Sequence, residues 1–198
     1  MFLKQSTLES LFKEAYKTQG LLVRHSECRD GSSAYTIIGG YWKIWMLSNR
    51  MPKEVKAALI KLCGDLPAVG EAFMSMKDRE NQYELDEMFE DLPQEFGKCE
   101  LELRRTNLLQ MSKCGPLRYY QGETGLVVTI REKMDILVDF GAIDRDNGEC
   151  EPEGPLMNED NQHYIWWGNE WCILKTNLVY GEPEEKEFRM ALRKMRII

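Results

Sequence analysis

The chain has few of the residues on which catalysis usually depends. Its 198 residues include only two histidines, His25 and His163. His25 and Cys28 lie three residues apart on an expected strand, so their side chains point to opposite faces, which argues against a Cys–His dyad. His163 can pair with Asp160 or Cys172, and a small enzyme based on His163 is therefore one hypothesis. A loop-edge histidine is the simpler interpretation, and we predict no catalytic residue.

Motifs that hold a metal ion or a phosphate are also missing. The six cysteines are widely spaced and include no C-x-x-C pair, whereas zinc ligands normally arrive in close pairs. In Asp144–Gly148 the glycine comes one residue too early for a calcium-binding loop, so a turn is the better explanation. Gly122 and Gly125 are not followed by the Lys-Ser/Thr pair of a phosphate-binding loop. No cofactor and no metal ion are therefore expected.

Long apolar runs are absent as well. No run approaches the roughly 20 residues that a membrane-spanning helix needs, so no membrane partner is expected. The first seven residues show no charged leader followed by an apolar stretch, and we therefore expect a cytoplasmic protein with reduced thiols. Hydrophobic residues at 43% and charged residues at 30% are typical of a soluble globular protein with one good core or two small ones.

Positive charge is missing from residues 80–97. The seven acidic residues of this segment alone match the net charge of −7, so the rest of the chain is neutral and broad non-specific binding to nucleic acid is not expected. Apolar spacing predicts a helix over residues 82–92 that Pro93 ends. Its acidic face is a solvated surface or a set of carboxylates that imitates a phosphate backbone in a basic groove. The candidate partner-binding acids are Glu84, Glu87, Glu90 and Asp91.

Aromatic residues are abundant near the end of the chain. Residues 163–174 hold three of the five tryptophans, on both sides of Gly168-Asn169, a dipeptide suited to a two-residue hairpin turn. The turn places Trp166 opposite Trp171 on one face and Trp167 on the other. Because both faces are apolar, the hairpin is either buried on both sides or presents one face to a partner.

The first 114 residues predict a mixture of helices and antiparallel strands. A helix from the capping box Ser6–Glu9 to Gly20 comes first, then strands at 21–28, 34–38 and 41–47, a helix from Pro52 to Gly64, a helix or strand within 67–79, the acidic helix, and a strand at 99–104. A turn at Gly39-Gly40 pairs Ile37 with Trp42 and buries both. Tyr41 and Trp45 then fall on the half-exposed face, where aromatic residues can bind a partner.

The last third shows a resemblance to a known fold. Gly122-Glu-Thr-Gly125-Leu-Val-Val-Thr-Ile130, a short polar stretch and Ile136-Leu-Val-Asp-Phe140 follow a G-x-x-G-x-V pattern with a returning I-x-V-x-F strand. This resembles the opening of an SH3-like β-barrel of the KOW type, over about residues 116–180. Residues 170–178 resemble its closing strand, although the loop at 141–162 is acidic rather than basic. The resemblance implies a binding module.

One part of this segment allows two interpretations. Thr129–Glu132 can cap a helix that runs to Phe140, with Gly141 as its stop. We prefer a strand at 134–140 because Ile136–Phe140 is compact, rich in β-forming residues and followed at once by turn residues.

These observations predict an α+β protein. An N-terminal helix, an antiparallel β-meander and a helical segment (residues 1–114) come before a small SH3-like β-barrel and a C-terminal helix at 184–195 (residues 115–198), with one shared core expected. The leading functional hypothesis is a non-catalytic macromolecule-binding protein, with a protein partner that offers a basic groove. An acidic inhibitor of a nucleic-acid-handling enzyme, of the kind that phages and mobile elements encode, fits this description.

The candidate partner-binding residues fall into two sets, and one alternative uses neither. The aromatic set is Tyr41, Trp45, Trp166, Trp167 and Trp171, and the acidic set is the four residues named above. The alternative is a nucleic-acid-associated KOW-like module whose local basic face consists of Arg104, Arg105, Lys113 and Arg118.

Overall fold

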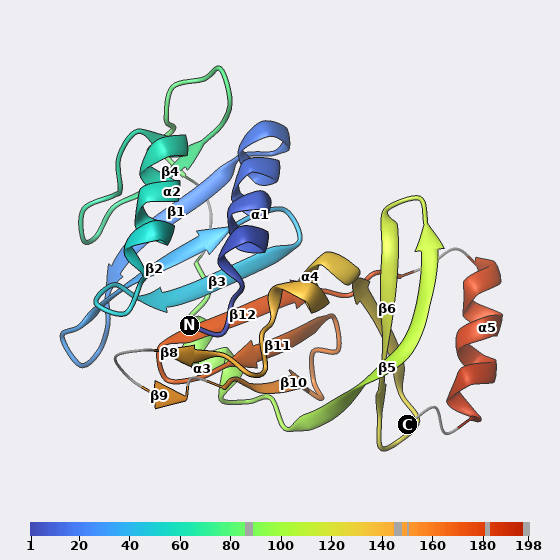
Figure 1. The fold of residues 1–198 in the computed structure, drawn as a ribbon. Coiled ribbons are helices and arrows are strands. Elements are labelled where there is room, and N and C mark those ends of the chain that lie inside the picture. Colours follow the sequence, from blue (N-terminus) through green and yellow to red (C-terminus); the bar gives the residue numbers. More distant parts are fainter. Residues whose placement is uncertain (86–88, 145–147, 150, 181–182, 196–198) are drawn as a thin grey trace.

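The computed structural model describes the chain except for residues 86–88, 145–147, 150, 181–182 and 196–198. Its main feature is one antiparallel sheet of ten strands in the order β4-β1-β2-β3-β12-β11-β10-β5-β6-β7 (Figure 1). These strands are β1 (Leu21–Glu27), β2 (Ser33–Ile38), β3 (Trp42–Leu47), β4 (Ala72–Ser75), β5 (Leu101–Ser112), β6 (Gly115–Gly122), β7 (Val127–Arg131), β10 (Glu153–Met157), β11 (Tyr164–Gly168) and β12 (Cys172–Asn177). The short strands β8 (Ile143–Asp144) and β9 (Gly148–Glu149) pair separately.

Helices cover parts of this sheet. They are α1 (Gln5–Thr18), α2 (Lys53–Cys63), α3 (Leu92–Phe96), α4 (Glu132–Leu137) and α5 (Pro183–Arg193). The helices α1 and α2 lie side by side on one face of β1–β3 (Figure 1). Leu8, Leu11 and Phe12 point from α1 into the core, where the Phe12 ring packs against Trp42. No helix in the described residues is long and apolar enough to cross a membrane.

The expected layout, a meander followed by an SH3-like barrel, is wrong. The hairpin that was expected to close a barrel instead joins the N-terminal meander, because β12 pairs with β3 from Cys172↔Met46 to Thr176↔Trp42. One core cluster accordingly contains buried residues from Phe2 to Leu178. The result is one long antiparallel sheet with few, short helices.

The preferred strand at 134–140 is also wrong, and the rival helical interpretation is closer. Residues 132–137 form α4, which buries Met134 and Leu137 three residues apart on one face. The expected cap is not formed, because Thr129 belongs to β7 and the residue before the helix, Arg131, makes no side-chain cap. Burial of two apolar side chains at helical spacing outweighs the β preference of Ile136–Val138.

The acidic helix at 82–92 does not form in the described part of that range. Gln82 bridges to Met74 of β4 through two backbone hydrogen bonds of 2.8 and 2.9 Å, which holds the segment in an extended form at the sheet edge. Residues 86–88, which include the candidate Glu87, lie outside the described residues. A helix begins only at Leu92, where Asp91 accepts a hydrogen bond from the Gln94 amide at 3.1 Å. Pro93 therefore lies in the first turn of α3, a position that needs no N–H donor.

The first helix, the second helix and the first three strands lie close to where the sequence places them. The α1 helix starts at Gln5, without the expected capping box. In both hairpins the turn comes later than expected, so that Ile37 pairs with Ile44, and Trp166 with Lys175. Each shift moves the pairing by an even number of positions, so the residues within the strands keep their predicted faces. Tyr41 and Trp171 now lie in the turns and pack against the main core, which corrects the prediction that they share the faces of Trp45 and Trp166.

Candidate functional site

The sheet face opposite α1 and α2 carries the candidate site. Cross-strand pairing aligns Arg24, Thr36, Trp45 and Ile173 in one row across β1, β2, β3 and β12. Residues of the same strands that alternate with this row, such as Tyr35 and Ile44, are buried in the main core. The row therefore points away from α1 and α2.

A second row places two positive charges against each other. Lys43 and Lys175 lie directly opposite each other on β3 and β12, an arrangement that destabilises a sheet unless an anion intervenes. Glu90 is that anion, because its Oε2 lies 2.7 Å from Nζ of Lys175 and 3.4 Å from Nζ of Lys43. The Lys175 side chain is only 3% exposed, and its Nζ lies 3.8 and 4.7 Å from the ring centres of Tyr164 and Trp166.

The pKa of Glu90 reflects this environment. Partial burial acts to raise the pKa of the carboxyl group, but the hydrogen bond and charge of Lys175 and the charge of Lys43 outweigh it, so the pKa lies below its ordinary value. Glu90 is thus ionised at neutral pH. It serves as the counter-ion of a lysine pair rather than as an exposed acid.

Residues 89–92, which we name the strap, are fixed to the sheet by further contacts. The Arg24 guanidinium lies 4.5 Å from the centre of the Phe89 ring, and Asp91 lies 3.7 Å from Nη2 of Arg29. Leu92 is buried in a second apolar cluster that also contains Trp166 and Ile173. The strap therefore crosses the outer face of the sheet as an ordered element.

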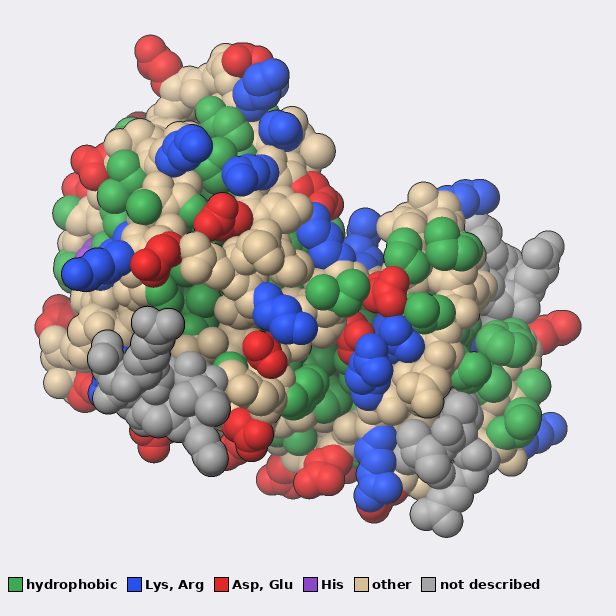
Figure 2. Space-filling model, in the orientation of Figure 1, with side chains coloured by type: hydrophobic (Ala, Val, Ile, Leu, Met, Phe, Trp, Pro, Cys, Tyr) green, Lys and Arg blue, Asp and Glu red, His purple; other side chains and the backbone are tan. Residues whose placement is uncertain are grey.

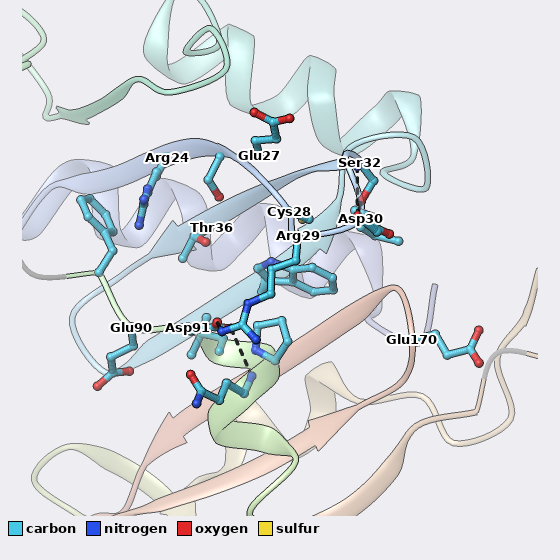
Figure 3. A pocket seen from close by; sticks show the side chains of 17 residues that line it. Arg24, Glu27, Cys28, Arg29, Asp30, Ser32, Thr36, Glu90, Asp91 and Glu170 are labelled. Carbon is cyan, nitrogen blue, oxygen red and sulfur yellow. Dashed lines mark hydrogen bonds and ion pairs between the residues drawn. The ribbon is translucent and has the colours of Figure 1, made fainter.

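A cleft of about 620 Å³, which we name the acidic cleft, lies between the strap and the β1–β2 loop (Figure 3). Arg24, Thr36 and Trp45 of the outer row line it, together with Phe89. Five carboxylates and two guanidinium groups contribute to the lining: Glu27, Asp30, Glu90, Asp91, Glu170, Arg24 and Arg29. The formal charge of the lining is therefore negative.

Three of these carboxylates form no ion pair with a cation of the described residues. Among the described residues, Glu27, Asp30 and Glu170 form no ion pair, whereas Glu90 is paired with lysines and Asp91 with Arg29. A hydrogen bond from the Ser32 hydroxyl, followed by one from the Ser32 amide, lowers the pKa of Asp30, which is ionised at neutral pH. In Figure 3, Arg29 reaches from the loop toward Asp91, while Glu90 points away from both. In the same view the carboxylates of Glu27 and Glu170 point away from the other labelled side chains, so the negative charge that the chain leaves uncompensated lies around the rim of the cleft.

Two of the five aromatic candidates are buried in the core. Trp166 is 2% exposed and packs in the second apolar cluster, whereas Trp167 is 0% exposed and packs in the main core on the other face. The hairpin is therefore buried on both sides, which is the first of the two alternatives that the sequence allowed. Neither indole is accessible to a partner in this conformation.

The remaining aromatic candidates are partly exposed, in three different places. Trp45 lies in the acidic cleft. Trp171 lies at the hairpin turn, 5.1 Å from the guanidinium of Arg50. The Tyr41 hydroxyl donates a hydrogen bond to Glu14 at 3.3 Å, and Arg131 stacks 4.2 Å above its ring. Of the candidate residues that the structure describes, Trp45, Glu90 and Asp91 therefore lie together. Glu84 is exposed and does not line the cleft.

The basic face of the alternative hypothesis is largely occupied by internal ion pairs. Arg105 donates to both carboxylate oxygens of Asp135 at 2.7 and 2.8 Å, and the buried Arg118 donates to Glu132 at 3.0 Å. Arg104 lies 3.6 Å from Glu123, and Lys113 lies in the turn between β5 and β6. Three of its four cations thus face carboxylates of the same chain.

Each of the two histidines is held by hydrogen bonds to nearby groups. His163 lies 2.7 Å from the Tyr180 hydroxyl through Nδ1, at the end of the hairpin opposite to Cys172. His25 contacts the Pro67 carbonyl and the Ser33 hydroxyl at 3.1 and 3.0 Å, which fixes it between two loops. Within the described residues, no three His, Cys, Asp or Glu side chains are grouped in a way that can hold a metal ion.

Sequence analysis missed several residues of the acidic cleft. Arg24 and Thr36 line it from two different strands, and Lys175, which pairs with the lining residue Glu90, comes from a third. The pairing of β3 with β12 joins residues about 130 positions apart. The only signal in the sequence was the alternation along each strand. It predicts on which face of the sheet a side chain lies, but not which other strand lies beside it.

No family model, curated protein or solved structure matches this chain. The functional argument therefore depends on the geometry of the site.

Proposed function

We propose that the protein is a non-catalytic binding protein that recognises a basic segment of a protein partner in the acidic cleft. The observation that carries this proposal is the position of Trp45 in one cleft with the carboxylates of Asp30 and Asp91, on the outer face of the sheet. An aromatic face and nearby carboxylates are the groups that bind arginine and lysine side chains. Negative potential in the cleft would also speed the approach of a basic partner.

The chain itself shows both types of contact that such a partner would make. Arg24 stacks on Phe89, and Arg29 faces Asp91 although its own side chain is 88% exposed. A guanidinium group of a partner can take the place of Arg29 with little loss, because an exposed ion pair contributes little to stability.

We extend the proposal to partners whose nucleic-acid-binding groove offers the basic segment. Ionised carboxylates in the cleft would take the places that phosphates occupy in such a groove. This extension is supported by the charge of the cleft and keeps an inhibitor of a nucleic-acid-handling enzyme as its most specific form.

A peptide titration tests the proposal. An arginine-rich peptide should bind and change the fluorescence of Trp45, with an affinity that falls as salt is added. The double variant Asp30→Asn/Asp91→Asn should weaken binding by about tenfold, since two charge-assisted contacts of the partner with the cleft are lost. The matched control, Glu80→Gln/Glu84→Gln, removes the same charge outside the cleft and should leave the affinity nearly unchanged.

Three results would count against the proposal. The cleft is not the site if both double variants weaken binding equally, because net charge alone would then explain the affinity. Absence of peptide binding at low salt would reject recognition of basic segments altogether. Binding of a single-stranded oligonucleotide in preference to the peptide would favour the alternative of a nucleic-acid-binding module.

A further inference from the structure

The hairpin of β5 and β6 leaves one strand edge uncovered. Within the described residues, β5 pairs with β10 only through Leu101 and Glu102, and from Leu103 onward it pairs with β6 alone. The hairpin extends away from the rest of the molecule (Figure 1), and a notch separates it from the α1–α2 half (Figure 2). Within the described residues, the outer edge of β5 near its tip therefore has no strand neighbour.

The register shows which backbone groups point to this edge. Met111 lies opposite Pro116, which has no N–H, so this is a non-hydrogen-bonded pair of the ladder. The N–H and C=O groups of Met111 therefore point away from β6, as do those of Leu109 two residues earlier. The edge offers two donors and two acceptors in the spacing that an added strand requires.

The side chains at this edge are apolar and exposed. Leu109 is 51% exposed and Met111 is 77% exposed, and both lie on the same face of β5 because they are two residues apart. Residues 107–112 contain no proline and no charged residue, the devices that usually protect an edge strand from pairing. The ladder is irregular between Arg105 and Leu109, and its tip, from Leu109 to Ser112, is regular.

We propose that the β5 edges of two copies of this chain pair in an antiparallel manner, about a two-fold axis at Gln110. In this register Leu109 of each copy faces Met111 of the other, which forms four backbone hydrogen bonds and brings four exposed apolar side chains together. None of the paired residues 109–111 is charged, so no like charges lie opposite each other. The edge is thus complementary to itself.

The small area of the β5–β5 contact determines how tightly the two copies can bind. One short edge pairing buries far less than the roughly 1,200 Å² of a standard interface, so the dimer should be weak and depend on concentration. This inference is independent of the acidic cleft, which lies on the opposite half of the sheet.

Sedimentation of the full chain over a range of concentrations tests the pairing. We expect a monomer–dimer equilibrium that Met111→Lys shifts toward monomer by at least tenfold in Kd, because a lysine on the edge opposes strand addition. Ile60→Lys, a change of the same type on the exposed face of α2, should not alter the equilibrium. Circular dichroism of both variants confirms that each is folded.

Cysteine cross-linking tests the register. In a background with Cys28→Ser and Cys114→Ser, Gln110→Cys should form a disulfide-linked dimer under mild oxidation, because residues that face each other in a non-hydrogen-bonded pair are within disulfide reach. Asn107→Cys, which lies outside the paired residues 109–111, should not. The proposal is overturned by a monomer at every concentration, by a dimer that Met111→Lys does not weaken, or by equal cross-linking of the two cysteine variants.

Discussion

At the scale of single residues, Glu90 shows how tertiary structure can change the role of a charge. It belongs to the most acidic segment of the chain and, from the sequence, looks like a residue that faces a partner. In the fold it neutralises Lys43 and Lys175, which two sequence-distant strands bring face to face. Its first role is therefore to make the β3–β12 pairing possible.

Replacement of Glu90 tests this role. Glu90→Gln should lower the free energy of unfolding by about 1–3 kcal/mol, because it leaves the buried ammonium group of Lys175 without its anion. Lys175→Met should cost less, since it removes the like-charge pair and keeps an apolar stem under the aromatic rings. Urea unfolding of the three proteins at neutral pH provides the comparison. An equal loss in the two variants would contradict a counter-ion role.

The same residue predicts a dependence of stability on pH. Because the pKa of Glu90 is lower in the folded chain than its ordinary value of 4.5, its contribution is present above that value and is lost as the pH falls through the folded pKa. The difference in melting temperature between the natural chain and Glu90→Gln should therefore stay nearly constant from neutral pH down to about 4.5 and shrink below it. Thermal melts at several pH values measure it, and a difference that stays constant would exclude Glu90 as the titrating group.

At the scale of elements, α4 depends on one buried carboxylate. Asp135 accepts hydrogen bonds from Arg105 on β5 and from the Tyr120 hydroxyl on β6. Burial, followed by the charge of Asp135, raises the pKa of Tyr120, which therefore stays protonated and remains a donor. A helix of six residues has little stability of its own, so these contacts and the burial of Met134 and Leu137 hold it in place.

Substitution of Asp135 should therefore be costly. Asp135→Asn is expected to destabilise the protein by about 3–5 kcal/mol, because it removes one partner from a largely buried ionic network. Tyr120→Phe should cost only about 1 kcal/mol, the value of one hydrogen bond. Chemical denaturation of both variants gives the two values. If Asp135→Asn proved as mild as Tyr120→Phe, the network would not be what anchors α4.

At the scale of the whole molecule, pairings between distant parts of the chain join the strands into one sheet. β3 and β12 are neighbours in the sheet although about 130 residues separate them in the sequence. Long-range pairing of this kind makes folding slow, because chain entropy must be lost before the contacts form.

A truncated chain tests how far the two halves depend on each other. Residues 1–114 alone should lack cooperative unfolding, because β3 loses its neighbour β12 and the main core loses Ile165, Trp167 and Leu174. Circular dichroism and thermal melts of this fragment, with and without residues 115–198 added, provide the measurement. A stably folded fragment would show that the boundary expected near residue 114 separates independent domains.

The sequence by itself determined the local elements and their faces. Apolar spacing placed α1, α2 and the first three strands, and alternation assigned Trp42, Trp166 and Trp167 to the correct sides of their strands. These features are local, because the periods of 3.6 and 2 residues act within one element. Such patterns held even where the turn, and with it the register, was displaced.

Only the tertiary structure decided which elements are neighbours, and the candidate site depends on that choice. Nothing in the sequence of β12 specifies β3 as its partner, so the sequence could not group Trp45 with Glu90 and Asp91, nor show that Lys43 faces Lys175. In its described part the acidic segment does not form the expected helix, and its Glu90 pairs instead with lysines of two strands that become neighbours only in the folded chain. Non-local pairing is a property of the whole chain, and local patterns do not contain it.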